Sequence, residues 1–143
     1  MSESNQHLGT ELTASIFGIL NKAPALAQIV EDRIYNNVPD KENFPYIVLG
    51  DEDNNGWTTH TSRGFKGTTT LNLWSRPEDG RGKAEVKRML ALVYQALDDV
   101  DLGIAGRCQV DFSHDRDFIL DEDDNRTFHG VMIFKFIFGG NEK

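Results

Sequence analysis

Leu71-Asn72-Leu73-Trp74-Ser75-Arg76 is followed by Pro77-Glu78-Asp79-Gly80-Arg81-Gly82 and then by a long amphipathic segment. The first six residues are typical of a strand, and the next six, with one proline and two glycines, are typical of a turn. Over residues 83–98 the apolar side chains recur at i, i+3, i+4 and i+7, which predicts a helix with one buried stripe. The stripe consists of Val86, Met89, Leu90, Val93, Ala96, Leu97 and Val100.

Upstream of this stretch, the pattern predicts two more helices and three extended segments. Apolar residues at helical spacing indicate a helix over 8–20, and Pro24 suits the first turn of a short helix over 24–30. Residues 33–35 favour a short extended piece, and 45–49 favour an apolar strand buried on both faces. Residues 50–62 are polar and rich in Gly and Asn, so we expect a long connection before a strand over 65–75.

Two strands are expected downstream, over 108–118 and 128–138. The first alternates mostly apolar even positions with polar odd positions, which predicts an outer row that contains Asp111, Asp115 and Asp117. The second is apolar on both faces, with Met132, Phe134, Phe136 and Phe138 on one of them. Since a two-layer domain leaves one sheet face open, we expect either another part of the chain or another subunit to cover it.

The order of these elements predicts a single α+β domain over residues 1–143. We expect a mostly antiparallel sheet of four to five strands, with two main helices packed on one face. A chain of 143 residues is long enough to bury a core without a metal or a disulfide. Residues 1–7 are polar, and we expect them to be frayed.

The charge balance limits the classes of partner. The chain has 15 Lys and Arg against 23 Asp and Glu, a net charge of −8, which disfavours a protein that grips nucleic acid. No apolar run reaches the roughly 18 residues of a membrane helix, so no membrane partner is expected. The N-terminus lacks the features of a signal peptide, and the single cysteine, Cys108, excludes an intrachain disulfide.

No motif predicts catalysis, a cofactor or a metal. Asp51-Glu52-Asp53-Asn54-Asn55-Gly56 matches the first half of a calcium loop, but Ser62 stands where the bidentate Glu belongs. Ser113-His114-Asp115 names three triad residues, yet neighbours on a strand point to opposite faces. We therefore expect that the protein is not an enzyme and that it acts by assembling with other proteins.

Five short motifs, in this order, resemble the tail-completion family of long-tailed phages, prophages and gene transfer agents. They are Asp32-Arg33-Ile34-Tyr35 with Val38-Pro39; Phe44-Pro45-Tyr46-Ile47-Val48-Leu49-Gly50; Leu71-Asn72-Leu73-Trp74-Ser75-Arg76; Gly82-Lys83-Ala84-Glu85 with Gln95-Ala96-Leu97; and Arg126-Thr127-Phe128-His129-Gly130-Val131. The resemblance covers about residues 12–138.

The resemblance implies a head–tail joining or tail-terminator protein: a ring, commonly a hexamer, that caps the tail tube and joins it to the head. The partners would be further copies of the chain, the tail tube protein and a head-completion or connector protein, with DNA passing through without specific binding. The location would be the head–tail junction of the virion, after assembly in the host cytoplasm. No catalysis and no cofactor are implied.

Two sets of residues are candidates for these contacts. For the subunit or tube interface they are Trp57, Met132, Phe134, Phe136 and Phe138. For an acidic surface facing the lumen they are Asp111, Asp115, Asp117, Asp121, Glu122, Asp123 and Asp124. The alternatives are another tail or neck structural protein, such as a tube subunit or an adaptor, and a small non-catalytic bacterial binding domain.

Overall fold

A computed structural model describes residues 8–36, 43–58, 63–77, 83–104, 108–124 and 126–139. In these ranges the chain forms three helices: α1 (Leu8–Asn21), α2 (Pro24–Val30) and α3 (Ala84–Leu97). It also forms five strands: β1 (Ile34–Tyr35), β2 (Tyr46–Thr58), β3 (Arg63–Ser75), β4 (Cys108–Asp121) and β5 (Phe128–Gly139). The predicted α+β class is confirmed.

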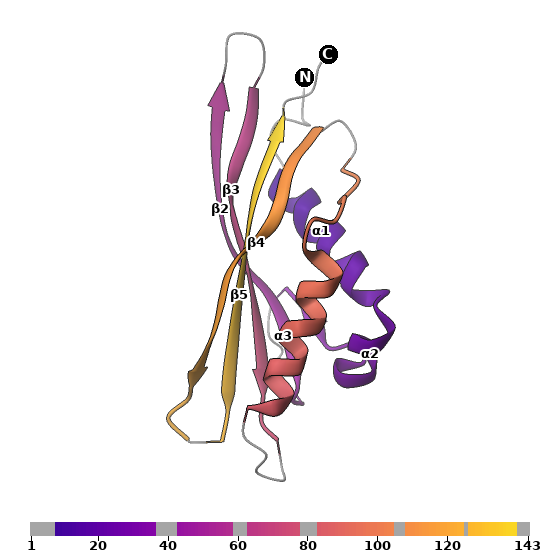
Figure 1. Ribbon diagram of the computed structural model, residues 1–143, viewed down its shortest axis with the longest axis vertical. Helices are drawn as coiled ribbons and strands as arrows, with labels where there is room; N and C mark the ends of the chain where they lie inside the picture. Colours follow the sequence, from indigo (N-terminus) through magenta and orange to yellow (C-terminus); the bar gives the residue numbers. More distant parts are fainter. Residues whose placement is uncertain are drawn as a thin grey trace.

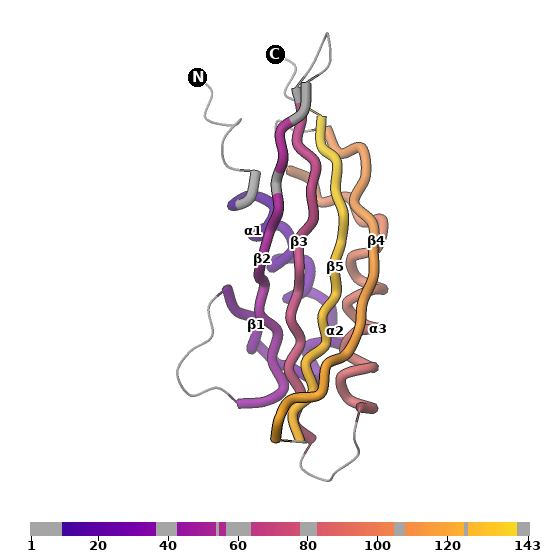
Figure 2. Tube along the Cα trace, turned by 90° about the vertical axis from the view of Figure 1, so that its left-hand side faces the viewer, coloured from indigo at the N-terminus to yellow at the C-terminus, as the bar shows by residue number. Residues whose placement is uncertain are grey.

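The described strands form one sheet in the order β1-β2-β3-β5-β4. Three junctions are antiparallel, and β1 pairs with β2 in parallel, so the sheet is mixed. The helices form a second layer on one face, and the strands coil strongly along their length (Figure 1). Seen from the left-hand side of Figure 1, the strands lie in front of the three helices (Figure 2). Among the described residues, the helices therefore cover one face of the sheet and leave the other open.

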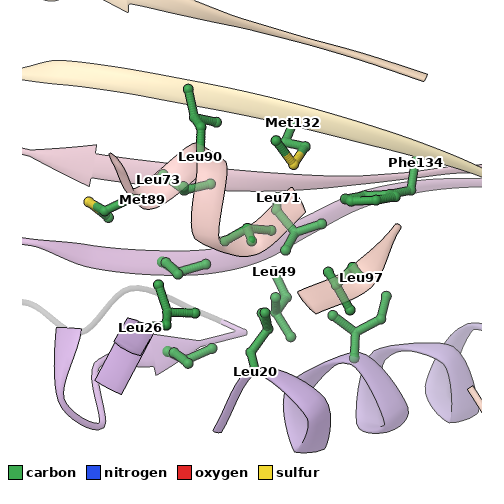
Figure 3. Close-up of a cluster of buried hydrophobic side chains, with 14 of the residues drawn as sticks. Leu20, Leu26, Leu49, Leu71, Leu73, Met89, Leu90, Leu97, Met132 and Phe134 are labelled. Carbon is green, nitrogen blue, oxygen red and sulfur yellow. The ribbon is translucent and has the colours of Figure 1, made fainter. Parts of the chain in front are cut away.

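The hydrophobic core lies between the sheet and the helices (Figure 3). The predicted stripe of α3 is confirmed there, with Val86, Met89 and Val93 fully buried. Leu71 and Leu73 of β3 meet this stripe from the sheet side, and both are also fully buried. The apolar residues of α3 recur with the helical period and those of β3 recur every second residue, so both sets face the core between the helix and the sheet.

Gly130 of β5 lies opposite Val86 and Leu90 of α3. A Cβ at this position would lie 3.0 Å from Val86 Cγ2 and 3.3 Å from Leu90 Cδ2. The absence of a side chain at Gly130 therefore lets α3 pack directly on β5.

The expectation of a long connection over residues 50–62 is wrong. Gly50 to Thr58 continue β2 and pair with β3 as far as Arg63, with a register shift between Gly50 and Glu52. The segment tolerates Asp and Asn because it lies beyond β1 at the border of the sheet, where polar side chains reach water. The two strands form a long ribbon that runs to one end of the molecule (Figure 1).

Candidate interaction surface

Two rows of side chains cross the open face of the sheet from one border to the other. Residues that pair directly across strands share a face, so the registers define each row. One row is Tyr46, Trp74, His129 and Leu120, and the other is Tyr35, Val48, Asn72, Val131 and Phe118. We call these nine residues the cross-strand band. They come from all five strands and lie far apart in the sequence.

Ring contacts hold the aromatic part of the band together. The rings of Trp74 and His129 stack with their centroids 3.9 Å apart, and the Trp74 and Tyr46 centroids are 6.3 Å apart. Phe44 packs on Tyr46 at 5.2 Å, and the guanidinium of Arg76 lies 4.4 Å from the centroid of Phe44. Such contacts add to the free energy of area burial, so they fix the shape of this surface.

His129 links the two rows. Its Nε2 lies 2.7 Å from Oδ1 of Asn72, a distance that fits donation by Nε2–H to the amide oxygen. Partial burial lowers the pKa of His129, although Glu122 acts in the opposite direction. The lowered pKa favours the neutral imidazole of His129.

At β4 the band ends in exposed apolar side chains. Phe118 is 40% exposed and Leu120 is 46% exposed, whereas Val131, one strand inward, is only 7% exposed. Val110, at the other end of β4, is exposed as well. Since β4 is the last strand of the described sheet, its outer edge concentrates apolar groups in contact with water.

A groove of about 710 Å³ lies beside this edge, between α3 and β4. Its lining includes Leu90 and Tyr94 of α3 and His114, Asp117 and Phe118 of β4. His114 Nε2 lies 2.7 Å from Asp117 Oδ2, and a hydrogen bond to Asp98 raises the pKa of Tyr94.

Ser113 does not complete a triad with this histidine–carboxylate pair. Ser113 pairs with Lys135 on the open face, and its hydroxyl donates to Asp111 at 3.3 Å. His114 pairs with Phe134 on the helix side. Within the described ranges, no three His, Cys, Asp or Glu side chains gather into a group that could hold a metal ion.

The structure corrects the prediction that Met132, Phe134, Phe136 and Phe138 form an interface. The four side chains are between 0% and 1% exposed and belong to the core cluster. The last strand is apolar on both faces, and these four residues occupy the face that the helices cover. They cannot meet a partner while the domain is folded, and the opposite face of β5 contributes Val131 to the band instead.

The structure also corrects the prediction that Asp111, Asp115 and Asp117 form one outer row on β4. Register shifts between Gln109 and Asp111 and between His114 and Arg116 break the alternation of the strand. As a result, Asp111 pairs with Ile137 on the open face, whereas Asp117 pairs with Met132 on the helix side and lines the groove. Asp115 is the residue that the second shift skips.

The acidic turn is partly neutralised by its own contacts. Asp124 accepts hydrogen bonds from the Thr127 hydroxyl at 2.7 Å and from the Arg126 N–H at 2.8 Å, which hold its pKa well below the usual range. Arg76 also pairs with Asp124 at 3.2 Å, and Lys83 pairs with Asp121 at 3.4 Å. Glu122 lies 3.9 Å from His129, and Asp123 is exposed.

Two further sequence candidates lie in the long ribbon. Trp57 pairs with Gly64 through its backbone, and its side chain lies outside the described residues. Asp51, Asp53 and Asn55 belong to a strand that pairs with β3 up to Thr58. A strand points alternate side chains to opposite faces, so this segment does not wrap around an ion as a calcium loop does.

Residues 14–139 match the family described as Tail completion protein gp17. The chain belongs to this family. The resemblance in the sequence is thereby confirmed, and the protein is a structural component of the phage tail. The family is one of structural virion proteins, which are generally not enzymes.

The fold itself recurs in a solved structure described as "Virion of native gene transfer agent (GTA) particle". One chain of that particle superposes with a TM-score of 0.83 at 22% sequence identity, covering 94% of this chain and 99% of the other. Among the curated proteins, none matches the chain. No helix in the described residues has the length and apolar composition needed to cross a membrane.

Proposed function

We propose that this protein caps the finished tail tube as a closed ring, commonly a hexamer, and joins the tail to the head. Its partners are then further copies of itself, the tail tube protein and the head-completion or connector protein. The observation that carries the proposal is the family match over residues 14–139.

The open sheet face supports a role in assembly. The apolar and aromatic cross-strand band ends in exposed Phe118 and Leu120, a surface that gains free energy when a protein partner covers it. The helix layer buries most of its apolar residues within the chain, although Phe17 of α1 and Tyr94 of α3 are exposed. An assembled particle provides the covering partner.

The charge supports passage of DNA without binding. A net charge of −8 repels phosphate over a range of about 8 Å at physiological ionic strength. We propose that the exposed acids Asp115 and Asp123 and the half-buried Asp111 contribute to this surface. Asp121 and Asp124 contribute less, because Lys83 and Arg76 pair with them.

The test is a particle that lacks this protein. We expect tails of irregular length, or tails detached from heads, as seen by electron microscopy, and rescue when the wild-type chain is supplied. A chain with Leu73→Asp, which places a charge in the core, is the matched control that should not rescue. Tails of normal length attached to heads would contradict the proposal.

The alternative is another tail or neck part, such as a tube subunit or an adaptor. The number and position of rings distinguish the two. A terminator gives one ring at the head–tail boundary, whereas a tube subunit gives many stacked rings along the tail. Labelling the C-terminus of the chain in the particle and counting the labelled levels decides between them.

A further inference from the structure

We propose that copies of this chain join edge to edge, with the outer edge of β4 in one copy lying against β1 of the next. The cross-strand band then continues from subunit to subunit. This inference rests on the proposed ring, and it names the surface that builds the ring.

The first argument is that both ends of one row reach an edge of the sheet. Tyr35 begins the row on β1, and Phe118 ends it on β4, with one paired residue on each strand between them. The two residues therefore lie at the same height on the open face. A second copy at the same height brings its Tyr35 next to Phe118 of the first, and buries the exposed face of that phenylalanine.

The second argument is the direction of the strands. β1 runs parallel to β2, β2 runs parallel to β5 through their shared neighbour β3, and β4 runs antiparallel to β5. The strands β1 and β4, which flank the described sheet in Figure 2, are therefore antiparallel to each other. Rotation about an axis along the strands preserves these directions, so the junction between copies is antiparallel, which gives the more stable ladder.

The third argument is that the part of β4 that carries the band keeps a regular edge, although two bulges of the kind that protect edge strands lie earlier in the strand. Its 14 residues include neither proline nor lysine, the residues with which soluble proteins commonly block edges. Its two register shifts precede Arg116 in the sequence. From Arg116 to Asp121 the pairing with β5 is regular. The regular part is the part that carries Phe118 and Leu120.

These arguments favour a second copy over an unrelated partner. The edge that offers apolar side chains and the edge that offers the aromatic ring of Tyr35 belong to the same chain, and they match in height and direction. Two different surfaces that fit each other produce a head-to-tail contact, which closes into a ring when the rotation per copy allows it.

The experiment is cross-linking inside assembled particles. In a Cys108→Ser background, which removes the single cysteine, the test pair is Tyr35→Cys with Phe118→Cys, treated with a short bismaleimide. Diagonal neighbours across strands lie about 7–8 Å apart, so the reagent tolerates a two-residue shift in register. A second pair, Asn36→Cys with Phe118→Cys, keeps the Tyr35 ring and guards against loss of folding.

We expect a ladder of covalent multimers that ends at the ring number, with most of the protein cross-linked. The control pair, Tyr35→Cys with Val110→Cys, tests the opposite end of β4 and should stay monomeric. If particles contain the ring but neither test pair cross-links, the inference is overturned and the proposed function stands. If particles contain no ring of this chain, the proposed function itself fails, and the inference fails with it.

Discussion

Gly130 illustrates how much of the packing depends on a single missing side chain. The space at this position is closed by Val86 and Leu90 of α3, which approach to 3.0 and 3.3 Å of where a Cβ would lie. Gly18 of α1 differs, because a Cβ there would meet nothing within 4 Å. Gly130 is therefore required by close packing, whereas Gly18 is not. Replacing each glycine with alanine should have opposite effects on stability.

We predict that Gly130→Ala lowers the free energy of unfolding by about 1–3 kcal/mol, since the new methyl group pushes α3 away from the sheet. Gly18→Ala is the matched control and should raise it by roughly 0.5–1 kcal/mol, because alanine loses less conformational entropy in a helix. Urea denaturation of both variants checks this. Equal effects of the two changes would contradict the close approach of α3 to β5.

At the scale of the elements, the apolar residues of β5 and β4 have different roles, although their sequence patterns are similar. Both strands carry large apolar residues, yet Phe134 of β5 is fully buried and Phe118 of β4 is 40% exposed. Phe134 also stacks on Phe112 with centroids 5.2 Å apart, within the core. We therefore assign stability to the helix side of β5 and association to the edge of β4.

This division predicts opposite results for two aromatic truncations. Phe134→Ala should cost the isolated chain about 3–5 kcal/mol of stability, as large-to-small core changes do. Phe118→Ser should change the stability of the isolated chain by no more than about 0.5 kcal/mol, but reduce its incorporation into particles. Thermal unfolding and quantification of the chain in purified particles provide the two readouts. A large loss of stability for Phe118→Ser would move this residue into the core.

The sequence predicts well those elements whose pattern is local. The stripe of α3 and the break at Pro24 predict the helices to within about two residues of their observed ends. The sequence does not predict residues 50–58 of β2, because Asp51, Asp53 and Asn55 are poor strand formers. Pairing with β3 overrides that preference in the folded chain. The band was missed because its residues meet only through the registers, and the bulges of β4 leave no local signal in the sequence.

For the whole molecule, electrostatics opposes the proposed junction at one end. Asp51, Glu52 and Asp53 lie along β2 beyond the part that β1 covers, and Asp111 and Asp115 lie on β4 at the other border. Edge-to-edge copies bring these two acidic sets toward each other, while the apolar ends of the band attract. The balance between the two depends on the ionic strength.

We predict that self-association of the chain strengthens with salt, because the Debye length falls from about 10 Å at 0.1 M to about 3 Å at 1 M. Sedimentation velocity over this range should show a rising average mass. A variant with Asp51→Asn and Asp115→Asn should associate at low salt and respond less to added salt. Association that weakens as salt rises would indicate a junction held by opposite charges.

The cross-strand band has a genetic consequence. Because one chain supplies both ends of the band, a single codon change at Phe118 would alter every junction of the proposed ring at once, and its effect would be multiplied by the number of copies. A loss too small to detect in one contact becomes decisive for closure. Compensation then requires a matching change at Tyr35 of the same gene, so these two positions should vary together among relatives.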